Sequence, residues 1–153
     1  MSLYQRILVP IDGSATADYA LGEAIKLAAD QGATLCVLHV LDDFPLYGEM
    51  AVTPGYQETL DLLRKYGEDT LAKAAHKARL GNVQVETVQS EAIGRRVADL
   101  IVEQAVAQKC QLIVIGTHGR RGFSRALLGS DAELVLREAP VPVLMIKYQA
   151  PAA

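Results

Sequence analysis

The chain contains 153 residues, of which 50% are hydrophobic, and carries a formal net charge of −3 at pH 7. That length suits one domain with a substantial core, so we expect a single domain over residues 1–153. The acidic balance argues against a nucleic-acid coat or an anionic-membrane binder, because both need a dominant basic surface.

The sequence carries no sign of export or membrane insertion. Its first ten residues, MSLYQRILVP, lack the charged head and long apolar body of a signal peptide, and no apolar run reaches membrane-spanning length. Cys36 and Cys110 lie in or beside apolar segments, which favours buried thiols in a reducing compartment over a disulfide framework. We therefore expect a cytoplasmic protein that binds neither membranes nor nucleic acid.

The first part of the chain predicts a strand, a helix and a second strand. Residues 6–11 are apolar on both faces, which is typical of a central strand covered by helices above and below. From Ala17 the apolar positions follow helical spacing until Gly32. Residues 34–41 are again continuously apolar and predict a second strand, with His39 as a hydrogen-bonded core residue.

The rest of the chain continues the alternation of helices and strands. Apolar residues at helical spacing predict a long helix over 56–80 and another from Gly94 to about Gln108. The remaining predicted elements are an alternating strand at 83–88, an apolar strand at 112–115, a helix over about 131–137 and a last strand over 143–147. The alternating pattern marks a strand with one wet face, which we place at an edge of the sheet.

Five strands alternating with helices predict an α/β fold with a parallel sheet and right-handed crossovers. The doubly apolar strands belong in the middle, which gives the order 3-2-1-4-5 with helices on both faces, a Rossmann-like arrangement. Chain direction across this sheet reverses between strands 1 and 4, and open α/β sheets bind ligands at such a switch point. Asp12 and Gly116 leave those two strands and are therefore candidate site residues.

The last strand, which begins at Val143 and ends at Lys147, lacks the polar alternation expected of an exposed edge. Antiparallel pairing with the same strand of a second copy would cover it around a twofold axis. We therefore expect a homodimer formed through this strand.

A glycine-rich segment joins the fourth predicted strand to the last predicted helix. It contains Gly116, Gly119, Gly122 and Gly129 together with three arginines. Small residues let backbone N–H groups approach an anion, and a helix start supplies further donors, so we expect this segment to hold the polyphosphate of a nucleotide. Its spacing is neither a Walker loop nor a dinucleotide fingerprint.

The segment GTHGR at 116–120, followed by Gly129 and Ser130, resembles the ATP-binding branch of the universal stress protein family. The resemblance extends over nearly the whole chain, from ILVPIDGS through LHVLD to APVPVLMIK. It implies the five-stranded sheet described above, adenine-nucleotide binding with ATP as the nucleotide, and dimers formed through the last strand.

The family pattern also implies a set of site residues. The residues implied around the ribose and phosphates are Gly116, Gly119, Arg120, Gly129 and Ser130, and those implied on the adenine and ribose side are Pro10, Ile11, Asp12 and Val40. Asp131 departs from the pattern, because a small or apolar residue or threonine is more usual after the Gly-Ser pair. Its carboxylate could help to hold Mg²⁺ or could repel the triphosphate.

Structural interpretations compete with these assignments. Ser130, with Glu133 three residues later, fits a capping box, and Asp12 fits an N-cap of the first helix. His118 has no sequence-placed partners for a catalytic triad.

The leading hypothesis is an ATP-binding homodimeric regulator or sensor of the stress response. The alternatives are a slow ATPase or an enzyme that phosphorylates its own Ser124 or Ser130, and a family member that has lost nucleotide binding.

Overall fold

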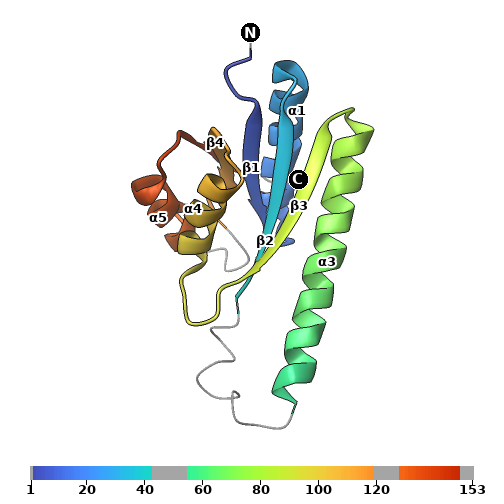
Figure 1. Ribbon diagram of the computed structural model, residues 1–153, viewed down its shortest axis with the longest axis vertical. Helices are drawn as coiled ribbons and strands as arrows, with labels where there is room; N and C mark the ends of the chain where they lie inside the picture. Colours follow the sequence, from blue (N-terminus) through green and yellow to red (C-terminus); the bar gives the residue numbers. More distant parts are fainter. Residues whose placement is uncertain (1, 43–54, 119–127, 149–153) are drawn as a thin grey trace, which may run out of the picture.

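The computed structural model describes residues 2–42, 55–118 and 128–148. These residues form a five-stranded sheet in the order β3-β2-β1-β4-β5, in which every neighbouring pair is parallel (Figure 1). The strands are β1 (Arg6–Ile11), β2 (Thr34–Leu41), β3 (Gln84–Glu91), β4 (Leu112–Gly116) and β5 (Val143–Ile146). The helices are α1 (Ala15–Gln31), α3 (Tyr56–Leu80), α4 (Val97–Ala107) and α5 (Ser130–Glu138). The predicted fold class and strand order are confirmed.

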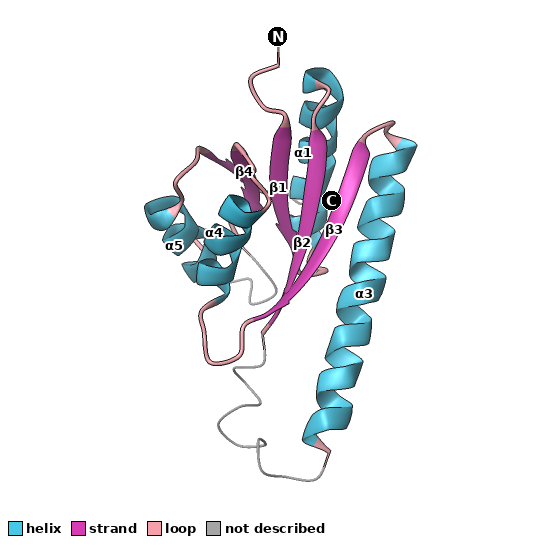
Figure 2. Ribbon diagram, viewed as in Figure 1, coloured by secondary structure: helices cyan, strands magenta, loops and turns pink. Residues whose placement is uncertain are grey.

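The core consists of two apolar layers, one on each face of the sheet. Alternate residues of β1 divide between them: Ile7 and Val9 pack with α1 and α3, whereas Leu8 packs with α4 and α5. All three side chains are completely buried, and burial of each contributes about 1.5–3 kcal/mol. The helices accordingly flank the sheet on both sides (Figure 2). This two-sided burial is why β1 reads as a continuous apolar run.

Helix α1 begins at Ala15, two residues before the first apolar position of its predicted stripe. Its N-cap is Ser14, whose hydroxyl accepts a hydrogen bond from the Ala17 amide at 3.1 Å. The Asp12 carboxylate instead accepts the Ser14 amide at 2.9 Å. Asp12 is therefore not the N-cap, and the capping interpretation of this residue is wrong.

Helix α5 begins at Ser130, and its N-cap is Gly129, with no side-chain capping hydrogen bond. The capping box proposed for Ser130 is therefore wrong, because the chain enters the helix one residue earlier than the pattern predicts. The backbone of Gly129 is held by the Thr117 carbonyl, which accepts its amide at 2.7 Å. This contact replaces a side-chain cap.

The two edges of the sheet differ in polarity. Strand β3 pairs with β2 up to Leu41 and Glu91, three residues beyond the predicted end of the alternating segment. It lies at an edge, as predicted. Strand β5 forms the other edge and exposes 42% of Leu144.

Within the three described ranges, no helix combines the length and the apolarity needed to cross a membrane.

Candidate functional site

A cavity of about 600 Å³ lies where β1, β2 and β4 end. Its lining includes Ile11 at the end of β1, Leu41 at the end of β2 and Gly116 at the end of β4. Strand β1 pairs with β2 on one side and with β4 on the other, so the cavity occupies the predicted switch point. Its size is typical of a small-molecule site.

Most of the residues predicted for the site line this cavity. They are Pro10, Ile11, Asp12, Val40, Gly116, Gly129, Ser130 and Asp131. Gly119 and Arg120 lie outside the described residues. Segments from the two ends of the chain thus meet at one cavity, as the strand order requires.

The turn after β1 is fixed by three hydrogen bonds. The Asp12 carboxylate accepts the Ser14 amide, and the Ser14 hydroxyl in turn accepts the Ala17 amide. From the opposite side, the Tyr66 hydroxyl donates to the Asp12 carbonyl oxygen at 3.3 Å. Gly13 has a φ of 83°, and a Cβ there would lie only 2.0 Å from the Tyr66 hydroxyl. Glycine at this position therefore permits the contact that ties α3 to the cavity wall.

The segments that leave β4 and enter α5 pack closely against each other and against α1. A Cβ on Gly129 would lie 2.8 Å from the Thr117 carbonyl oxygen, and one on Gly116 would lie 2.7 Å from the Thr16 methyl group. Both distances are too short for a side chain without displacement of a neighbour. Gly116 and Gly129 are therefore required by close packing, whatever the cavity binds.

The N-terminus of α5 opens onto the cavity. Ser130 and Asp131 line it and are exposed, and the buried Ala132 completes this wall. The first amides of any helix have no intrahelical acceptor, so this end of the cavity offers backbone donors and the positive end of the helix dipole. The Asp131 carboxylate lies among the same groups and adds negative charge.

Sequence reasoning missed the wall that α3 contributes. Leu63 and Tyr66 line the cavity beside His39, which is buried, and the His39 and Tyr66 rings meet edge to face with their centroids 6.2 Å apart. The available signal was Gly67, which lies inside the apolar stripe of a long helix. A Cβ there would lie 2.6 Å from Nδ1 of His39, so the glycine marks a close approach between helix and strand.

The cavity lining combines apolar and polar side chains. The apolar ones include Val40, Leu63 and Ile101 from β2, α3 and α4, and the polar ones include Thr117, whose hydroxyl lies 3.0 Å from Nδ1 of His118. Within the described ranges, no three His, Cys, Asp or Glu side chains gather closely enough to hold a metal ion by themselves. The arrangement suits a ligand with a flat apolar part and an anionic tail.

Comparisons with known proteins agree with this geometry. Residues 3–147 match the model of the Universal stress protein family. A universal stress protein of Methanocaldococcus jannaschii is 35% identical over 95% of this chain and 84% of its own length. The universal stress protein UspA of Lactobacillus plantarum superposes with a TM-score of 0.83 at 28% identity, covering 95% of this chain and 99% of that one.

A second similar structure was solved with a bound ligand. It is a universal stress protein of Archaeoglobus fulgidus in complex with dAMP, which has a TM-score of 0.66 and 26% identity over 95% of this chain and 99% of its own. The match to the family model covers nearly the whole sequence, and the fold is shared along its length. The chain therefore belongs to the universal stress protein family.

Proposed function

We propose that this chain binds an adenine nucleotide, specifically ATP, in the cavity at the ends of β1, β2 and β4, and that it acts as a homodimeric, nucleotide-dependent regulator of the stress response. The observation that carries the proposal is the cavity itself, whose lining combines apolar side chains with the first residues of α5 and with the closely packed Gly116 and Gly129. The dAMP complex of the Archaeoglobus fulgidus protein supports an adenylate as the ligand class.

The two sides of the cavity suit the two halves of a nucleotide. The base and ribose would lie against Val40, Leu63 and the turn at Asp12, where an apolar surface is bordered by polar backbone groups. The phosphates would lie toward Gly129 and the first turn of α5, where amide donors and the helix dipole favour negative charge.

Asp131 is the residue that would hold Mg²⁺ beside the phosphates. Magnesium is usually bound by one or two carboxylates together with substrate phosphates and water, so a single carboxylate at the rim of a phosphate site fits this ion. The exposed position of Asp131 in the first turn of α5 meets that requirement. The bound ion would neutralise phosphate charge that this carboxylate would otherwise repel.

Isothermal titration of ATP, with and without Mg²⁺, tests binding and the role of the metal together. The native chain should bind ATP more tightly with Mg²⁺, and D131N should lose most of that difference while still binding metal-free ATP. If D131N instead binds metal-free ATP and Mg-ATP equally more tightly than the native chain, Asp131 only repels the anion. Absence of any heat with ATP, ADP or AMP would contradict the proposed site. Phosphate release measured in the same samples tests the hydrolytic alternative.

Nucleotide binding would regulate the protein by stabilising the state that binds. A ligand at 100 times its dissociation constant stabilises that state by about 2.7 kcal/mol. Such a shift is large enough to change which surface conformations of a small domain are populated. The unfolding midpoint should therefore rise with ATP concentration, which differential scanning fluorimetry would measure.

The proposed dimer uses β5, the apolar edge of the sheet. Leu144 is 42% exposed on this edge, and an apolar edge strand offers unpaired backbone groups to a second copy. L144K should convert a dimer to a monomer in light-scattering measurements. L80K, at the exposed C-terminal end of α3, is the matched control and should leave the dimer intact. A native monomer at micromolar concentration would contradict this part of the proposal.

A further inference from the structure

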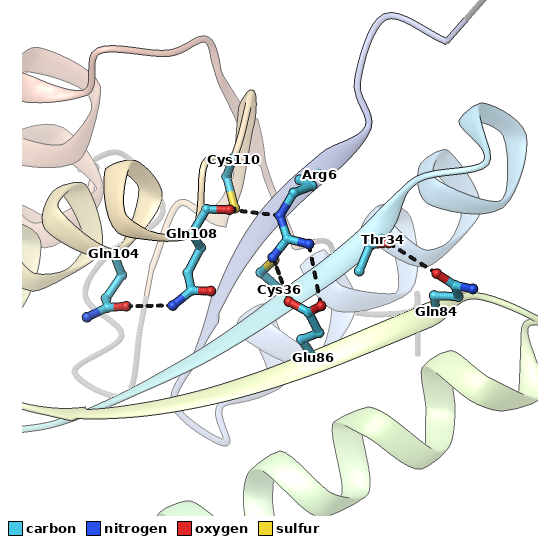
Figure 3. Close-up of polar contacts among 8 residues, drawn as sticks. All are labelled: Arg6, Thr34, Cys36, Gln84, Glu86, Gln104, Gln108 and Cys110. Atoms are coloured by element: carbon cyan, nitrogen blue, oxygen red, sulfur yellow. Dashed lines mark hydrogen bonds and ion pairs between the residues drawn. The ribbon is translucent and has the colours of Figure 1, made fainter.

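A compact cluster of four side chains lies at the amino ends of the strands, the opposite end of the sheet from the cavity. Arg6 begins β1, Cys36 is the third residue of β2, Glu86 is the third residue of β3, and Cys110 lies in the turn before β4. These residues come from four separate segments and meet near the amino ends of the strands (Figure 3). None of them lines the cavity.

Arg6 holds the cluster together. One guanidinium nitrogen donates to Sγ of Cys36 at 3.0 Å and to the Glu86 carboxylate at 2.5 Å, and Nε donates to the Gln108 carbonyl at 2.7 Å. The Cys36 thiol also contacts the same carboxylate, with Sγ 4.0 Å from Oε2 of Glu86. A cysteine sulfur therefore lies directly beside a fixed positive charge, with a carboxylate nearby to accept its proton.

The second thiol completes the arrangement. The Cys110 thiol lies 4.0 Å from the Gln108 carbonyl oxygen and also within hydrogen-bonding reach of Cys36. The hydrogen bond between the two thiols lowers the pKa of Cys36 despite its burial, with the Arg6 charge adding to the effect. The same hydrogen bond and burial raise the pKa of Cys110. The two sulfurs thus differ in role: one is stabilised as a thiolate, and the other remains a thiol beside it.

Exposure is divided between the ion pair and the thiols. The side chains of Arg6 and Glu86 are 29% and 53% exposed, whereas Cys36 is fully buried and Cys110 is 5% exposed. Both thiols are therefore shielded from bulk solvent, beside an ion pair that is partly exposed. The Arg6 charge favours the Cys36 thiolate, whereas the negative charge of Glu86 opposes it.

We propose that Cys36 and Cys110 form a peroxide-sensitive thiol pair, in which Cys36 is the attacking nucleophile, Cys110 resolves it into a disulfide, and Arg6 stabilises the attacking sulfur. The oxidant is a hydroperoxide. This site is independent of the nucleotide cavity, and its chemistry uses only thiols that are both present as free cysteines in the structure.

The reaction balances in two steps. The Cys36 thiolate attacks one peroxide oxygen, so that the S–O bond forms and the O–O bond breaks. The leaving oxygen takes up the proton that Cys36 released on ionisation and departs as water or an alcohol. Cys110 then attacks the sulfenic sulfur of Cys36; the S–S bond forms, the S–O bond breaks, and hydroxide leaves as water with the Cys110 proton. Two electrons pass from the thiols to the peroxide.

Closure of the disulfide brings the two sulfurs from hydrogen-bonding contact into a covalent bond. The two sulfurs must approach to about 2 Å, with the geometry that a disulfide demands. Cys110 lies in the short turn after Lys109, which has a φ of 54°, rather than within a strand. We therefore expect the turn between α4 and β4 to adjust on closure, because Cys36 is paired within β2 on both sides.

The test treats the reduced full-length protein with excess hydrogen peroxide, followed by alkylation and peptide mass mapping. The native chain should lose two hydrogen atoms, yield linked peptides containing Cys36 and Cys110, and recover both thiols on reduction. C110S should accumulate a sulfenic acid at Cys36 that dimedone traps. C36S should leave Cys110 as a thiol. Circular dichroism confirms that the reaction occurs in the folded protein.

Variants of Arg6 test the charge. R6M should slow oxidation by at least about tenfold, because the thiolate loses its cation, and R6K should restore part of the rate. K73M, on the exposed face of α3, is the matched control and should react like the native chain. The proposal is wrong if both thiols survive peroxide, if the linkage joins two chains, or if Cys110 oxidises in C36S. Should R6M fail to fold, trapping in C110S decides the order of attack by itself.

Discussion

The two ends of the same sheet have opposite characters. At the carboxyl ends of the strands, β1 and β4 run into turns whose glycines keep side chains away, and a cavity of about 600 Å³ remains. At the amino ends, the long side chain of Arg6 occupies the corresponding position. It contacts the sulfur of Cys36 on β2, the Glu86 carboxylate on β3 and the Gln108 carbonyl. The same strands therefore end in a cavity on one side and in a packed side-chain cluster on the other.

The difference shows what opens a site in a parallel sheet. At the cavity, Gly13, Gly116 and Gly129 let neighbouring segments pack closely around the space at the strand ends. Closure depends on an arginine long enough to satisfy a carbonyl, a sulfur and a carboxylate at once. Four predictions would break or sharpen this contrast.

The largest effect is expected from G129V at the open end. A Cβ there already lies 2.8 Å from the Thr117 carbonyl oxygen, so valine must push α5 and the segment after β4 apart. We expect ATP affinity to fall by at least about a hundredfold in isothermal titration. G22V on α1, where a Cβ meets only the flexible end of Lys77 at 3.8 Å, should bind like the native chain. Native affinity in G129V would show that this contact does not shape the cavity.

R6M is expected to have the next largest effect, at the closed end. Methionine fills similar space but leaves the Gln108 carbonyl without its donor at 2.7 Å. The free energy of unfolding should fall by about 1–3 kcal/mol, as measured by urea denaturation. K73M should change it by less than about 0.5 kcal/mol. Equal free energies of unfolding for R6M and K73M would mean that the hydrogen bonds of Arg6 contribute no net stability.

Two helix-interior glycines should respond with opposite signs. G67A, beside the cavity, places a Cβ 2.6 Å from Nδ1 of His39, and we expect it to destabilise the protein by about 1–2 kcal/mol. G22A places a Cβ in ordinary contact with the flexible end of Lys77 at 3.8 Å, so the higher helix propensity of alanine should stabilise by up to about 1 kcal/mol. Thermal unfolding of both variants measures the difference. Stabilisation by G67A would show that α3 can move away from β2 at no cost.

The smallest effect concerns the pH dependence of the closed end. The hydrogen bond and charge of Arg6 lower the pKa of Glu86 in the folded protein. The carboxylate therefore contributes stability above its unfolded pKa, near 4.3, and that contribution is lost as the pH falls through the folded pKa. The unfolding midpoints of the native chain and E86Q should differ at pH 6 and converge as the pH approaches 3. E68Q on the exposed face of α3 should show a smaller pH-dependent difference.

Sequence reasoning identified the fold and most of the cavity for one reason. Periodicity reports how many faces of an element are buried, and the order of buried and half-buried strands then places Asp12 and Gly116 at one switch point. It misplaced the start of α5 because Ser130 and Glu133 fit a capping pattern, whereas the backbone contact between Gly129 and Thr117 fixes the helix start. The predicted roles of Gly119 and Arg120 lie outside the described residues and remain predictions.

The sequence by itself determined which segments become strands and helices and which strands are central. It therefore also determined at which strand ends the cavity lies. Only the tertiary structure decided that Tyr66 reaches the Asp12 carbonyl and that Arg6 lies against Cys36, because these contacts join residues from separate elements. The periodicity of apolar residues indicates which positions are buried, but it does not indicate which residues they contact. Side-chain contacts across elements depend on register and helix placement, and those are set only when the whole sheet is assembled.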